Sequence, residues 1–110
     1  MRQAKLALAV TILLSAATSS AAAQDGDAAA GRAFVREACK SCHIVEPDER
    51  ATRSIVIGPG FRDIANTPGM TATALRVFLR TSHPKMPNLI LTAEQTADVI
   101  AYILSLGDPR

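Results

Sequence analysis

Polar and hydrophobic positions first repeat at helical spacing between residues 28 and 40. Residues three and four apart lie on one face of a helix, so this pattern predicts a first helix with one apolar face. Asp25 and Asp27 precede it, and aspartate is a favoured N-cap because its carboxylate accepts hydrogen bonds from the first free backbone N–H groups. The apolar face is expected to contain Gly31, Phe34, Val35 and Ala38.

Two further helical segments are predicted in the middle of the chain. A short helix is expected over residues 61–66, ended by the Thr67-Pro68-Gly69 sequence. Thr71 is a candidate N-cap for the next helix, which is expected to end near Thr81. Its apolar stripe would consist of Leu75, Phe78 and Leu79.

The last predicted helix covers residues 92–106. Thr92 and Gln95 have the spacing of a capping box, and Gly107 and Pro109 are typical of a helix end. The segments 44–57 and 82–91 lack helical periodicity and are predicted to be loops. With no strong strand pattern, the chain is predicted to be all-α. The apolar face of the last helix is expected to contain Val99, Ile100, Ile103, Leu104 and Leu106.

Residues 1–23 have the features of a secretory signal peptide. Arg2 and Lys5 are followed by a nearly continuous apolar run over residues 6–14, and Ala21-Ala22-Ala23 offers a cleavage site. An uncleaved membrane anchor is the alternative, although the apolar run is short for a membrane span. We therefore expect export to the periplasm, one domain over residues 24–110, and no stable membrane insertion once the segment is removed.

Charge gives no indication of a nucleic-acid partner. The chain has 12 Lys and Arg against 10 Asp and Glu. Loss of Arg2 and Lys5 with the signal segment would leave ten basic and ten acidic residues, and no run of basic residues remains. So small a mature domain buries limited apolar surface, which favours a large apolar cofactor in its core.

The candidate chemistry is concentrated in Cys39-Lys40-Ser41-Cys42-His43. A Cys-x-x-Cys-His sequence is the attachment signature of a c-type haem. In one helical turn Cys42 and His43 follow Cys39 at i+3 and i+4, so the three side chains share a face and can meet one flat ligand. Two thiols could then bond to the porphyrin edge while the imidazole reaches the iron.

The two cysteines have three other possible interpretations. A thioredoxin-like redox pair would follow a strand, whereas the residues before Cys39 are predicted to be helical. A zinc site could use both cysteines with His43 and His83, although the adjacency of Cys42 and His43 is poor for tetrahedral geometry. A disulfide between Cys39 and Cys42 would close a very small loop and stabilise little.

Several residues could complete the coordination of a haem iron. Met86 lies between two prolines in a predicted loop and is the favoured sixth ligand, with His83 and Met70 as alternatives. In the Gly58-Pro59-Gly60-Phe61 segment, a backbone carbonyl could accept a hydrogen bond from the far ring nitrogen of His43, or the segment could be a simple turn.

The order of these motifs resembles that of the class I cytochromes c, specifically the small soluble monohaem proteins of Gram-negative bacteria. The resemblance covers residues 28–106. The motifs that carry it are Gly31 and Phe34, Cys39-Lys40-Ser41-Cys42-His43, Gly58-Pro59-Gly60-Phe61, Met86-Pro87-Asn88-Leu89 and Val99-Ile100-Ala101-Tyr102.

This resemblance implies the cytochrome c fold, in which three to four helices surround one haem and the first and last helices cross. It implies haem c attached through Cys39 and Cys42, axial ligation by His43 and Met86, and support of His43 by the Pro59 carbonyl. A one-electron carrier rather than an enzyme is expected. Its redox partners would be a dehydrogenase, a cytochrome complex or a terminal oxidase.

Some expectations remain open at this point. The protein could be a monomer or the haem subunit of a larger periplasmic oxidoreductase, and a five-coordinate gas-binding haem protein is a further alternative that Met86 disfavours. Lys40, Lys85 and Arg53 could steer an acidic partner.

The chain has no Trp and one Tyr. Propionate hydrogen bonds would therefore come from Arg53, Arg62 or Asn88, or be missing.

Overall fold

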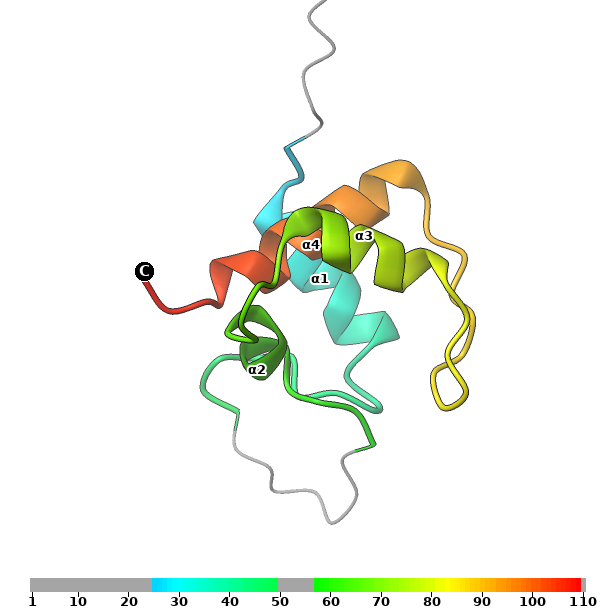
Figure 1. Cartoon of the computed structure of the whole chain (residues 1–110), viewed down its shortest axis with the longest axis horizontal. Coiled ribbons are helices and arrows are strands. Elements are labelled where there is room, and N and C mark those ends of the chain that lie inside the picture. The colour runs from blue at the N-terminus through cyan, green and yellow to red at the C-terminus, as the bar shows by residue number, and fades with distance from the viewer. Residues whose placement is uncertain (1–24, 50–56, 110) are drawn as a thin grey trace, which may run out of the picture.

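The computed structural model describes residues 25–49 and 57–109 (Figure 1). Within these ranges it contains four helices and no strand, which confirms the prediction of an all-α fold. The predicted signal segment lies outside the described residues. None of the described helices is both long enough and apolar enough to cross a membrane. The helices are α1 (Ala28–Ala38), α2 (Phe61–Ala65), α3 (Ala72–Arg80) and α4 (Ala93–Ser105).

The starts of the helices agree with the predicted caps. The Asp27 carboxylate accepts hydrogen bonds from the backbone N–H groups of Ala29 and Ala30. Thr71 caps α3 in the same way. Thr92 and Gln95 form the expected capping box at the start of α4, with both reciprocal hydrogen bonds present. These short polar side chains satisfy backbone donors that the first turn of a helix leaves free.

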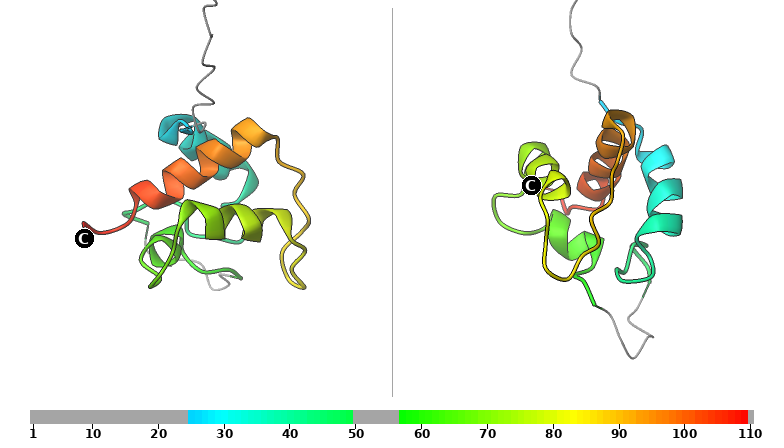
Figure 2. Two further views of the ribbon diagram at one scale, coloured as in Figure 1. Left: turned by 45° about the horizontal axis from the view of Figure 1, so that its top comes forward. Right: turned by 90° about the vertical axis from the view of Figure 1, so that its right-hand side faces the viewer.

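Helices α1 and α4 cross in close contact (Figures 1 and 2). A Cβ atom built on Gly31 would lie 2.0 Å from the Asp98 carbonyl oxygen and 2.9 Å from Tyr102 Cβ. Only a residue without a side chain fits there. The Asp98 carboxylate also accepts a hydrogen bond of 2.7 Å from the Asp27 backbone N–H, which fixes the start of α1 to α4.

Among the described elements, α4 packs against each of the other three helices. The right-hand view of Figure 2 shows α4 between α1 on one side and α3 on the other. Ile100 and Ile103 of α4 are almost completely buried and belong to one core cluster with Val35 of α1 and Leu75 of α3.

Two predicted core positions differ from expectation. Leu104 is 37% exposed, although it was expected on the apolar face of α4. Successive helix residues turn by about 100°, so Leu104 lies at the edge of the face centred on Ile103. Phe78 is 48% exposed because its side chain borders the cavity described below rather than the packed core.

Candidate functional site

A cavity of about 690 Å³ lies among α1, α2, α3, α4 and the loops after α1 and α3. This size falls within the roughly 300–1,000 Å³ of typical ligand and cofactor sites. Most of its wall is apolar, which suits a large hydrophobic group. The apolar side chains include Phe34, Ile64, Leu75, Leu79, Val99 and Ile103, and the polar or sulfur-bearing ones include Cys39, Cys42, His43, Met70, His83 and Met86.

The Cys39–His43 segment forms one turn directly after α1. The backbone N–H groups of Cys42 and His43 both donate to the Cys39 carbonyl oxygen, at 3.2 and 3.0 Å. All three side chains line the same cavity, as the i, i+3, i+4 spacing predicted. Helix α1 ends at Ala38, two residues before the predicted end, and Cys39 is its C-cap, whose backbone N–H donates to the Val35 carbonyl oxygen.

This arrangement argues against the other interpretations of the motif. The cysteines follow a helix rather than a strand, and they are not joined by a disulfide. Within the described residues, no group of three or more His, Cys, Asp or Glu side chains could hold a metal ion. The zinc and thioredoxin-like interpretations, which the sequence already disfavoured, therefore have no structural support in residues 25–49 and 57–109.

The Cys39 thiol lies in an apolar environment. Burial raises its pKa to about 11, and the neighbouring Cys42 contributes to the shift. Burial disfavours the thiolate because the charged form loses its hydration. A neutral thioether carries no such penalty, so this position fits a sulfur bonded to a hydrophobic group.

The His43 ring is held from behind by the 58–61 segment. Its Nδ1 atom lies 2.7 Å from the Pro59 carbonyl oxygen, which is the contact that the sequence suggested. A carbonyl can only accept, so Nδ1 carries a proton, and in the neutral form of an imidazole held in this way the lone pair is on Nε2. The His43 side chain lines the cavity, so this nitrogen is available as a metal ligand.

Gly58 is needed for this contact. An ideal Cβ atom on Gly58 would lie 2.3 Å from His43 Cε1 and 2.6 Å from Nδ1. Its backbone N–H donates to the Cys42 carbonyl at 2.9 Å, which ties the segment to the Cys-x-x-Cys-His turn. The close backbone approach expected for the flanking glycines is therefore present at Gly58.

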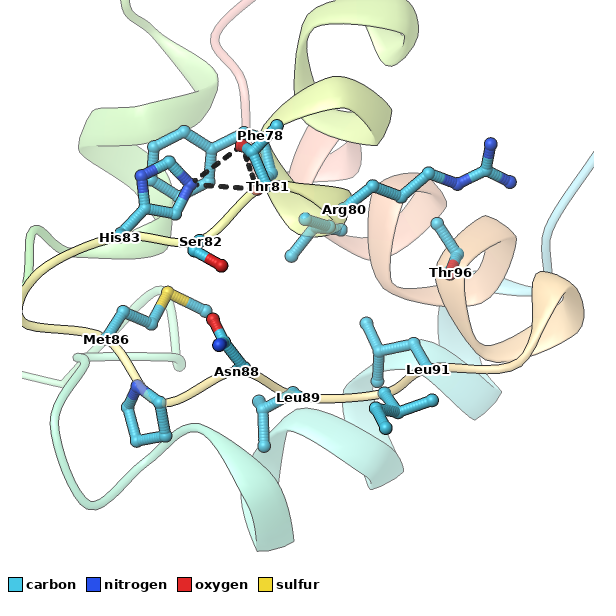
Figure 3. Close-up of a pocket in the computed structure, with 13 residues that line it drawn as sticks. Phe78, Arg80, Thr81, Ser82, His83, Met86, Asn88, Leu89, Leu91 and Thr96 are labelled. Carbon is cyan, nitrogen blue, oxygen red and sulfur yellow. Dashed lines mark hydrogen bonds between the residues drawn. The ribbon is translucent and has the colours of Figure 1, made fainter.

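Three candidate ligands line other parts of the cavity. Met70 is half-buried and packs against the core cluster. The Nε2 atom of His83 lies 2.9 Å from the Phe78 carbonyl oxygen, so it is already used as a donor (Figure 3). Met86 is half-buried and lines the same cavity. The structure thus brings all three candidates to one cavity, and the choice of Met86 as a second ligand stays a prediction.

The residues predicted to contact the haem propionates or to steer a partner differ in how close they lie to the large cavity. Arg62 pairs with Asp108 at 2.7 Å on the surface and does not line the large cavity. Asn88 lines a smaller cavity of about 270 Å³ beside it, whereas Lys85 lines the large one. Arg53 lies outside the described residues. Of the cations predicted to steer a partner, Lys85 lies at the large cavity, whereas Lys40 lies in the Cys39–His43 turn and is not among the residues that line this cavity.

Sequence analysis did not assign cavity roles to Phe61 and Ile64. Both line the large cavity, and the Phe61 ring centroid lies 5.3 Å from that of His43. Their i, i+3 spacing in the short helix α2 was a usable signal, since it places both on one face.

A Cys-x-x-Cys-His turn that opens onto a large apolar cavity, in an all-α domain, defines a c-type cytochrome. The chain is similar to Cytochrome c-552 of Bradyrhizobium diazoefficiens, with 34% identity over 97 residues, covering 88% of this chain and 91% of that protein. It belongs to the small bacterial class I cytochromes c, whose cofactor is covalently bound haem c. No protein-family model and no solved structure matches the chain.

Proposed function

We propose that this protein is a periplasmic one-electron carrier whose haem is bonded to Cys39 and Cys42 and ligated by His43 and Met86. The observation that carries this proposal is the sharing of one apolar cavity by the two cysteines, His43 and Met86. When bound, haem c supplies an iron that alternates between the ferrous and ferric states. Membership of the family supports electron transfer as the general function.

The polypeptide would favour electron transfer over catalysis in three ways. Ligation by His43 and Met86 would leave no open iron position for a substrate. The Pro59 carbonyl fixes the His43 tautomer, and the resulting hydrogen bond of 2.7 Å keeps the ring oriented in both oxidation states. A thioether ligand and an apolar wall disfavour the additional charge of ferric iron, which raises the reduction potential.

Export and docking form the less direct part of the proposal. The predicted signal segment, residues 1–23, supports a periplasmic location, since it has the n-region, apolar run and small residues of a secretory signal. Lys85 at the cavity would meet an acidic redox partner, with the electrostatic field fading over about 8–10 Å. The near balance of acidic and basic residues makes such steering modest.

The ligand assignment can be tested on holoprotein produced in a host competent in cytochrome maturation. The far-red charge-transfer band of a thioether–iron bond is expected in the wild type and in Met70→Ala, and is expected to be lost in Met86→Ala. Carbon monoxide should bind the ferrous wild type slowly and Met86→Ala rapidly. Persistence of the band in Met86→Ala would exclude Met86 as the ligand.

Covalent attachment needs a separate measurement. Acidified organic solvent should leave the pigment on the wild-type polypeptide, whereas replacement of both Cys39 and Cys42 by Ala should allow its extraction. A mass corresponding to the chain without residues 1–23 plus one haem would also support cleavage and export. Pigment that is extracted from the wild type would contradict the proposed thioether bonds.

A further inference from the structure

His83 occupies a specific position at the end of α3. Its ring stacks on Phe78, with ring centroids 3.7 Å apart and planes inclined by 15°. Its Nε2 atom lies 2.9 Å from the Phe78 carbonyl oxygen and 3.2 Å from Thr81 Oγ1, as the dashed lines in Figure 3 show. Because the carbonyl can only accept, the proton is on Nε2 and the hydrogen bond runs from His83 to α3.

This hydrogen bond adds a donor to a carbonyl at a helix end. The last carbonyls of a helix have no partner within the helix, and Phe78 is in the last turn of α3. The Thr81 backbone N–H also donates to the Phe78 carbonyl at 3.2 Å, and the Thr81 hydroxyl lies 3.1 Å from it. His83 thus joins the loop that follows α3 to the C-terminal cap of that helix.

The same residue is linked to Met86. His83 and Met86 form an isolated antiparallel β-bridge, with Pro84 and Lys85 between them. Pairing across a bridge fixes the relative position of the two backbones, so a displacement of His83 would move Met86. The fixed φ of Pro84 further restricts the turn that connects them.

The rest of the loop has weaker support. The Ile90 side chain is 99% exposed and Leu89 is 37% exposed. A cavity of about 270 Å³ separates the loop from the end of α3 and the start of α4, and Figure 3 shows Met86, Asn88 and Leu89 on one side of it, facing Arg80 and Ser82. Few packed side chains therefore hold this loop, and its attachment at His83 gains importance.

We propose that His83 is a positioning residue that ties the 82–91 loop to the C-terminus of α3 and thereby holds the Met86 thioether at the sixth iron position. This inference rests on the proposed ligation by Met86. In this role His83 acts through Met86 and does not bind the iron, since its Nε2 atom is committed to Phe78. Loss of the attachment would increase the fraction of molecules in which the loop has left the iron.

The test is a titration of the ferric holoprotein with free imidazole, which competes with Met86 for the iron. The loss of the far-red band measures how much Met86 has been displaced. Loss of a hydrogen bond and a ring stack is expected to raise the apparent imidazole affinity of His83→Ala about tenfold. His83→Phe keeps an aromatic ring but has no donor, so a smaller increase, about threefold, is expected. Ser82→Ala alters an exposed neighbour in the same loop and should match the wild type.

The outcomes separate this inference from the proposed ligation. An unchanged imidazole affinity in both His83 variants, with the far-red band present in the wild type, would overturn the positioning role and leave Met86 ligation intact. A lower melting temperature with unchanged imidazole affinity would show a merely structural contact and would also overturn it. If the wild type lacked the far-red band and the iron became high-spin in His83→Ala, His83 would be the ligand. This result would refute both proposals.

Discussion

The Tyr102 hydroxyl of α4 donates a hydrogen bond of 2.6 Å to the Val45 carbonyl, 57 residues away in the chain and in the buried interior. Val45 follows the Cys-x-x-Cys-His turn by two residues and is 2% exposed. This contact fixes the segment that follows the haem-binding motif to α4, the helix that crosses α1. The single Tyr of the chain therefore supports the motif from outside the cavity.

Tyr102→Phe is expected to destabilise the holoprotein by about 1–3 kcal/mol, because it leaves the buried Val45 carbonyl without this donor. Chemical denaturation followed by circular dichroism would measure the change. Arg62→Ala removes a surface ion pair with Asp108, whose side chains are both more than half exposed, and should change stability by less than about 1 kcal/mol. Equal effects of the two substitutions would contradict the importance of the buried contact.

The same tyrosine predicts a loss of stability at high pH. Burial raises the pKa of Tyr102, and the negative charge of Glu46 adds to the effect. The folded state therefore binds the phenolic proton more tightly than the unfolded state. This contribution is fully present below the ordinary tyrosine pKa of about 10 and is lost as the pH rises through the raised value. Unfolding free energies measured above pH 9 should fall more steeply for the wild type than for Tyr102→Phe.

An acidic counterpart is predicted at Glu46. This carboxylate pairs with Arg32 at 2.6 Å and also with Arg36, and the hydrogen bond from Arg32 is the main cause that lowers its pKa, while partial burial opposes the shift. Its stabilising contribution is present above the ordinary glutamate pKa of about 4.3 and is lost as the pH falls. Glu46→Gln should therefore flatten the acid limb of the stability profile, most clearly at low salt. An identical acid limb in the variant would reject this assignment.

Gly31 provides a test in which two effects of opposite sign compete. Replacing a helical Gly by Ala normally stabilises by roughly 0.5–1 kcal/mol. Here the added Cβ atom would lie 2.0 Å from the Asp98 carbonyl of α4, and overpacking of this kind costs about 1–3 kcal/mol. Gly31→Ala should therefore destabilise the holoprotein in chemical denaturation. A stabilised variant would mean that α1 and α4 are less closely packed than described.

The sequence was sufficient to predict where the helices begin and how the Cys-x-x-Cys-His motif is arranged. Capping residues such as Asp27 and Thr92 act on backbone groups two or three positions away, so local sequence defines the helix starts. The Cys-x-x-Cys-His motif is likewise local, because its three functional side chains lie within a single turn. These features could be predicted because each depends on neighbours in the chain.

Other features depend on contacts between distant segments. Periodicity placed Leu104 on an apolar face but could not show how wide a face α1 and α3 would cover, and Leu104 is partly exposed. The loop sequence offered both His83 and Met86 as ligands. Only the fold shows that the Nε2 atom of His83 is used by the Phe78 carbonyl. A hydrogen bond to a helix end leaves no periodic signal in the sequence.

The two glycines of the 58–61 segment, Gly58 and Gly60, provide a matched pair of substitutions. A Cβ atom on Gly58 would lie 2.3 Å from His43 Cε1. One on Gly60 would lie 3.1 Å from the Asp63 carboxylate, which is the end of a rotatable side chain, and at an ordinary contact distance of 3.8 Å from Ile44 Cβ. Gly58→Ala should therefore displace the His43 ring, weaken its hydrogen bond to the Pro59 carbonyl and shift the reduction potential, since this hydrogen bond tunes the basicity of the ligand.

Gly60→Ala should leave the potential close to that of the wild type, because the Asp63 side chain can rotate away. Hyperfine-shifted proton resonances of the His43 ring in the ferric holoprotein provide a second measurement, as they respond to ring orientation. They should move in Gly58→Ala and remain in place in Gly60→Ala. Equal shifts in the two variants would indicate a general disturbance of the segment, and would remove the argument that Gly58 is required by the histidine ring.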